Sequence, residues 1–150
     1  MKRALPTLVA ALACLAACDA TVPTGPPLQG AQQALFADYP TGLFADAARA
    51  CTRTGGKTRQ HDRDDLLCEQ LPDPQLAAAL ILHFDGTIED LPSLNTRIYG
   101  APAVQGYVVT VDNYIDMPGR DGRTRQIRLP SEGLDESMRA MLQRSGGRPF

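Results

Sequence analysis

The chain has 150 residues, a length typical of one domain, and 43% hydrophobic and 21% charged residues, as in folded globular proteins. This composition excludes an intrinsically disordered chain, which would have fewer apolar residues and a larger net charge. The formal net charge is only −2, whereas a nucleic-acid-binding domain usually carries a strongly basic face. We therefore expect no nucleic acid among the partners.

The first residues have the features of an export signal. Lys2 and Arg3 provide a positively charged start, and an apolar stretch runs from Leu5 to Leu15. That stretch is too short to cross a bilayer as a helix, because about 20 apolar residues are needed. The pattern therefore predicts a signal peptide and not a membrane-spanning segment.

The end of this signal, Leu15-Ala16-Ala17-Cys18, resembles the bacterial lipobox. The resemblance implies cleavage after residue 17 and attachment of lipid, including acyl chains such as palmitate, to the thiol of Cys18. A protein that carries more than one acyl chain is held firmly at a membrane. The motif covers only the signal, and it implies a lipoprotein of the bacterial cell envelope that faces the periplasm, with membrane lipid as its first partner.

Two alternatives stay open at this end of the chain. Ala11-Leu12-Ala13 fits an ordinary secretory cleavage site before Cys14, which would leave Cys18 as an odd, unlipidated thiol. Asp19 resembles the residue that keeps lipoproteins in the inner membrane of enterobacteria, but other bacteria use nearby positions differently. We expect the inner membrane, with the outer membrane as the alternative.

The residues after Cys18 predict a tether followed by one domain. Residues 19–30 contain three prolines and two glycines, which disfavour a regular helix and favour an extended chain. No internal repeat and no second tether divides the remainder. We therefore expect a signal peptide over 1–17, a lipidated cysteine and tether over 18–30, and a single domain over 31–150.

Helical spacing dominates the first part of this domain. Residues 31–51 predict a helix that Pro40 interrupts, with a second segment that begins near Thr41 and places Cys51 on its buried stripe. The polar residues 52–65 then predict a loop with a turn at two glycines. Residues 76–84 predict a short, largely buried helix capped by Asp73, although their continuous apolar run is also compatible with a buried strand.

The C-terminal third carries the strand signals. Residues 106–115 alternate in a period of two, and residues 124–129 return after a Pro-Gly and Asp-Gly turn. Residues 97–100 are a candidate third strand, and an apolar stripe predicts a last helix over 135–145. The predicted fold class is α+β, with N-terminal helices, a small antiparallel sheet of two or three strands, and a C-terminal helix.

Two cysteines remain in the predicted domain. Cys51 and Cys68 form an even pair in a compartment that permits disulfides, so we expect one structural disulfide. A redox-active pair usually has close spacing such as Cys-x-x-Cys, which these two lack.

Motifs for catalysis, metal or cofactor binding are weak. The run His61-Asp62-Arg63-Asp64-Asp65 offers ligand atoms, but Arg63 opposes a cation and no second cluster completes a shell, so a solvated charged loop is expected. Acidic pairs such as Glu89-Asp90 or Asp112/Asp116 could in principle perform acid–base chemistry on a glycan, but most such residues are surface charges. We predict no enzyme, no metal and no cofactor.

One cluster of charge suggests a binding surface. Four arginines lie within nine residues around the predicted hairpin: Arg120, Arg123, Arg125 and Arg128. Guanidinium groups match phosphate and carboxylate geometry, although nearby aspartates dilute the field. The first hypothesis is a non-catalytic adaptor that presents its domain to an envelope protein. The alternative is a module that binds an anionic lipid headgroup, lipopolysaccharide or cell-wall polymer through these arginines, and a cell-wall hydrolase is a remote third.

Overall fold

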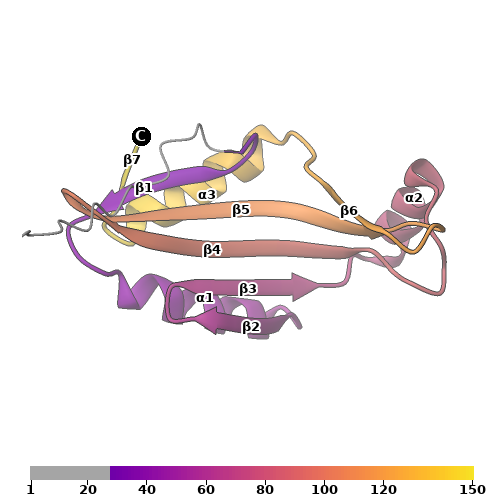
Figure 1. Cartoon of the computed structure of the whole chain (residues 1–150), viewed down its shortest axis with the longest axis horizontal. Coiled ribbons are helices and arrows are strands. Elements are labelled where there is room, and N and C mark those ends of the chain that lie inside the picture. Colours follow the sequence, from indigo (N-terminus) through magenta and orange to yellow (C-terminus); the bar gives the residue numbers. More distant parts are fainter. Residues whose placement is uncertain (1–27) are drawn as a thin grey trace, which may run out of the picture.

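The computed structural model describes residues 28–150, and within them one antiparallel sheet of seven strands is accompanied by three helices (Figure 1). The elements in chain order are β1 (Gln32–Phe36), α1 (Thr41–Arg53), β2 (Lys57–Asp62), β3 (Asp65–Gln70), α2 (Pro74–Phe84), β4 (Ser93–Ala103), β5 (Gly106–Pro118), β6 (Thr124–Ile127), α3 (Glu132–Arg144) and β7 (Arg148–Pro149). The expected fold class, with a sheet of two or three strands, is therefore wrong: the domain is dominated by its sheet. None of the helices in this part of the chain is long and apolar enough to cross a bilayer.

The two longest strands form the centre of the sheet. The strand order is β2-β3-β4-β5-β1-β7, and β6 pairs with β5 outside this path. β4 and β5 pair along their whole shared length, from Ser93 opposite Asp116 to Ala103 opposite Gly106. β1 pairs with the first half of β5 and β6 with its last residues, so both lie along the same side of β5. Figure 1 shows β4 and β5 spanning the molecule.

The helices leave one face of the sheet open. Figure 1 shows α1 and α3 behind the sheet on the same side, with α2 at the end where β5 meets β6. Alternate residues of β5 point toward α1 and α3 and are buried there, as Val109 and Val111 show. The main core contains Ala34, Phe36, Leu43, Phe44, Leu66, Ile98, Tyr107, Val109, Val111, Met138 and Leu142. A smaller core joins Leu80 of α2 to Ile115 and Met117.

Two predictions in the N-terminal half are wrong. The first part of the expected helix over 31–51 is strand β1, which pairs with β5 and buries Ala34 and Phe36 on one face. The expected loop over 52–65 is largely β2 and the start of β3, which pair with each other. Every residue of β2 is exposed, so this edge strand has no buried face to impose an apolar alternation.

Several local predictions are confirmed. The segment over 76–84 belongs to helix α2, where the Asp73 carboxylate accepts hydrogen bonds of 3.0 Å from the backbone N–H groups of Gln75 and Leu76. The strands expected over 106–115 and 124–129 correspond to β5 and β6, and the expected last helix corresponds to α3. Gly86 follows α2 at a point where the chain lies close to β5. A Cβ atom on this residue would lie 2.1 Å from the side chain of Met117, so a larger residue would not fit without a shift.

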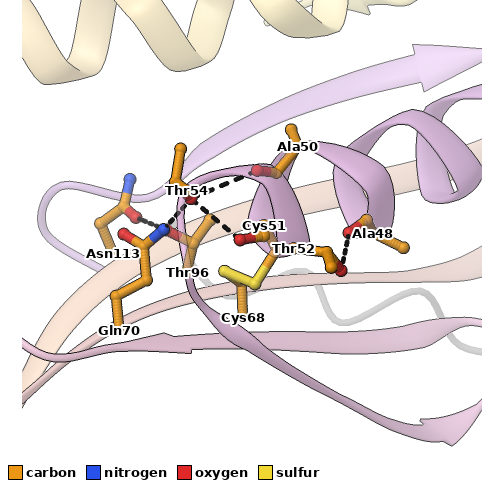
Figure 2. The surroundings of a disulfide bond; sticks show 9 residues. All are labelled: Ala48, Ala50, Cys51, Thr52, Thr54, Cys68, Gln70, Thr96 and Asn113. Carbon is orange, nitrogen blue, oxygen red and sulfur yellow. Dashed lines mark hydrogen bonds between the residues drawn. A yellow bond between two sulfur atoms is a disulfide. The ribbon is translucent and has the colours of Figure 1, made fainter.

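The predicted disulfide between Cys51 and Cys68 is confirmed. It joins the last turn of α1 to β3, with Cα atoms 5.8 Å apart and 17 residues apart in sequence. Figure 2 shows the end of α1 held there by further bonds, because the Thr54 hydroxyl donates to the carbonyls of Ala50 and Cys51. Gln70 of β3 donates to the same hydroxyl. The disulfide therefore lies between α1 and the sheet, within a polar junction.

Replacing both cysteines by alanine is expected to lower the free energy of unfolding by about 3 kcal/mol, because the bond closes a loop of this length in the unfolded chain. Urea unfolding of the two proteins measures the difference. A reductant should destabilise the parent protein by a similar amount and leave the double variant unchanged. Equal stability of parent and variant would contradict this assignment.

Candidate functional site

The open face of the sheet carries a network of paired charges. Its most buried member is Asp112 of β5, which is 3% exposed. Arg128, just after β6, donates from Nε and Nη2 to the two carboxylate oxygens of Asp112, at 3.1 and 2.6 Å. A forked pair of this kind compensates a buried carboxylate for its lost hydration.

A second forked pair lies on the same face. Arg97 of β4 donates to both carboxylate oxygens of Asp65 on β3, at 2.9 and 2.7 Å. The hydrogen bond from Arg97 lowers the pKa of Asp65, against the opposing effect of burial. Arg97 also lies 5.0 Å from the ring centre of Tyr99, and Arg128 lies 5.5 Å from that of Tyr114. The aromatic rings and the arginines therefore stabilise each other.

Two further hydrogen bonds lie on this face. The buried amide of Asn95 donates to a carboxylate oxygen of Asp116 at 3.0 Å, and Gln33 donates to the Thr110 hydroxyl at 3.1 Å. Burial raises the pKa of Asp116, although a hydrogen bond from Gln126 acts in the opposite direction. These contacts join five strands, so the network of the open face is a structural feature of the sheet.

The carboxylates proposed for acid–base chemistry do not form a pair. Asp112 and Asp116 lie four residues apart on β5, about 13 Å along a strand, whereas paired carboxyl groups of glycosidases lie about 5 to 9.5 Å apart. Asp112 is also engaged by Arg128. Glu89 and Asp90 are exposed residues between α2 and β4. The arrangement lacks two carboxyl groups that converge on one substrate bond.

The expected charged loop over 61–65 is instead the hairpin between β2 and β3. Its Arg63 guanidinium lies 4.3 Å from the ring centre of Tyr39, whose hydroxyl donates to the Arg63 carbonyl at 2.6 Å. Asp65 binds Arg97, as described above. Among residues 28–150, no group of three or more His, Cys, Asp or Glu side chains is arranged to hold a metal ion.

The four arginines singled out in the sequence do not share one environment. Arg128 binds Asp112 on the open face, and Arg120 forms an ion pair of 3.2 Å with Asp85 at the end of α2. Arg123, in the β5–β6 turn, and Arg125, in β6, are both exposed. Two of the four guanidinium groups are thus already paired, and the anion-binding role of the set stays a prediction. The lipidation site, Cys18, lies outside the described residues.

A different feature at the end of the sheet is exposed and apolar. We call it the α2 groove; its lining residues are Leu71, Pro72, Pro74, Ala77, Ala78, Ile81, Leu82, Ile88 and Leu91, around a volume of about 570 Å³. Leu82 is 85% exposed, Ile88 76% and Leu71 69%. Isolated exposed leucines are common in proteins, but side chains that together line one groove mark an interaction site.

The exposure of the α2 groove follows from the sequence of α2. The helix is apolar around most of its circumference, but the expectation that it is largely buried is wrong, because only Ala77 and Leu80 are buried. Leu80 packs on the sheet, with Ile81 and Phe84 partly buried beside it. Ala78, Ile81 and Leu82 of the helix line the groove together with Ile88 and Leu91 of the segment that follows it. The lining residues share no sequence motif, and the signal in the sequence that could have indicated them is an apolar helix without a polar face.

The Asp112–Arg128 pair is expected to contribute measurably to stability. Changing Arg128 to Gln should cost about 2–3 kcal/mol, because it strands a buried carboxylate. Asp112→Asn should cost less, because the partly exposed guanidinium can reach water, and the double variant should cost less than the sum. Urea unfolding of all four proteins measures the coupling. The matched control is Arg59→Gln in the more exposed Arg59–Glu69 pair, expected below about 0.5 kcal/mol. Strictly additive costs would contradict the coupling.

Comparison with known proteins identifies no relative of this chain. No protein-family model, no curated protein and no solved structure matches the chain.

Proposed function

We propose that the protein is a non-catalytic, lipid-anchored adaptor of the bacterial envelope that binds a protein partner through the α2 groove. The observation that carries this proposal is the groove itself, an apolar surface that the domain leaves uncovered on residues 28–150. An adaptor needs a stable apolar patch on a folded domain, and burial of exposed leucine side chains is a common source of binding free energy.

The N-terminal motif supports the anchored location. Leu15-Ala16-Ala17-Cys18 resembles a lipobox, and the proline-rich residues 19–30 would follow the lipid. Residues 28–30 form a turn at the start of the domain. The nine residues 19–27 would reach about 30 Å at most when fully extended, which would allow the domain to contact a neighbour beside or above the membrane surface. The location faces the periplasm in this proposal, where the Cys51–Cys68 disulfide is stable.

The two competing functions have less support. An anionic ligand at the β5–β6 turn would have Arg123 and Arg125 available, because Arg120 and Arg128 are engaged by carboxylates. A hydrolase would require converging catalytic groups, and Asp112 and Asp116 are separated along β5. The adaptor accounts for an exposed apolar surface that neither alternative uses.

Changing Cys18 to Ser is expected to release the protein from the membrane, because serine lacks the thiol that receives the lipid. Cell fractionation measures the distribution, and mass spectrometry of the parent protein should show an N-terminal cysteine carrying acyl chains. Cys14→Ser is the matched control and should leave the protein in the membrane fraction. Membrane retention of the Cys18 variant, or an unmodified parent protein, would contradict the anchor.

A photo-reactive residue in place of Ile88 is expected to give a reproducible cross-link to one envelope protein in intact cells. Leu82→Asp in the same protein should reduce this adduct about tenfold or more, because it places a charge in the apolar groove. The unfolding temperature should change little, since Leu82 is 85% exposed. A probe at Val104, which is 95% exposed in the β4–β5 turn, is the control at the other end of β5. Equal cross-linking from both positions would refute a groove-specific partner.

A further inference from the structure

The chain segment that lines the α2 groove is acidic, and Arg120 of the neighbouring β5–β6 turn is the cation that pairs with it. All of the groove's lining residues come from residues 71–91, a segment that contains four carboxylates and no lysine or arginine. The four are Asp73, Asp85, Glu89 and Asp90, and all are exposed. An apolar groove with an acidic rim favours an occupant that combines apolar and basic side chains.

Two of these carboxylates are already used within the domain. Asp73 caps the N-terminus of α2, and Asp85 pairs with Arg120 from the neighbouring turn. Glu89 and Asp90 have no side-chain ion pair among the described residues. The contact of Arg120 with Asp85 shows that a guanidinium group fits the edge of this region. Glu89 and Asp90, beside Ile88 and Leu91 of the lining, remain available for a partner.

The same charges disfavour two other occupants. A second copy of the chain docked groove to groove would bring two acidic rims together, and like charges at an interface oppose association. The surface of a bilayer with anionic lipids attracts lysine and arginine, and the segment that lines the groove has neither. The acidic side chains therefore favour a basic protein segment over a second copy of the chain or an anionic bilayer, although the apolar lining alone could contact all three.

From these observations we infer that the α2 groove binds a protein segment whose apolar side chains are flanked by lysine or arginine. The inference rests on the proposed adaptor function and specifies its partner. Helix α2 has 11 residues and is about 16 Å long, so a matching helical segment would span roughly three turns. Its apolar face would fill the space beside Ala78 and Leu82, and its basic residues would lie against Glu89 and Asp90.

The test uses the full-length lipoprotein in intact cells, with a photo-reactive residue in place of Leu82. Glu89→Lys/Asp90→Lys should reduce the protein adduct about tenfold, because two attractive contacts become repulsive. Glu89→Gln/Asp90→Asn should give a smaller loss. The matched control reverses two exposed carboxylates elsewhere, Asp38→Lys/Glu136→Lys, and should leave the adduct unchanged. Thermal unfolding of each variant checks that the domain stays folded.

Peptide mass spectrometry then identifies the attachment site on the partner. The inference is supported when charge reversal at Glu89 and Asp90 removes the adduct and the cross-linked peptide carries lysine or arginine within one helical turn of an apolar stretch. It is overturned when the adduct is insensitive to the reversal, or when the attached group is lipid, a second copy of this chain, or residues 19–27 of the same chain. A charge-insensitive protein adduct leaves the adaptor function standing, whereas no protein adduct at all defeats both.

Discussion

The antiparallel pairing of β4 with β5 is the interaction on which the other elements depend. The two strands are joined over residues 93–103 and 106–116, and each side of this ribbon receives further strands. Alternate residues of β5, such as Val109 and Val111, face α1 and α3 and form the core, while Asp112 lies on the opposite face. Successive side chains of a strand point to opposite faces of the sheet. The register of β4 against β5 therefore determines which residues the helices bury and which residues form the network of the open face.

Elements could be predicted from the sequence where their own residues carry the pattern, such as an alternation of apolar and polar residues or a helix cap. β5 alternates because one of its faces is covered by helices, and α2 begins where Asp73 can cap it. Edge strands lack such a signal, since β2 is exposed at every residue and is held by backbone pairing with β3. β1 was also missed, because Gln and Ala suit a helix as well as a strand, and its partner β5 lies more than 70 residues away.

The disulfide could be predicted from the sequence, whereas the environments of the arginines and the α2 groove depend on how distant segments meet in the fold. Cys51 and Cys68 could be paired because only one combination remained in the predicted domain. The arginines were grouped by closeness in sequence, but the β5–β6 connection sends Arg128 onto the open face and leaves Arg120 beside α2. The α2 groove joins Leu71 to Leu91 through a turn of the chain, and no periodicity within α2 encodes that contact.

The open face and the α2 groove differ in whether their side chains already have partners within the domain. On the open face the buried carboxylate of Asp112 and the amide of Asn95 have partners within the domain, so a ligand there would compete with existing bonds. At the α2 groove, the side chains of Leu82 and Ile88 have no hydrogen bonds that a partner would have to replace. Each would contribute the free energy of transferring an exposed apolar side chain out of water. The adaptor proposal therefore assigns the partner to the end of the sheet, where α2 buries only Ala77 and Leu80.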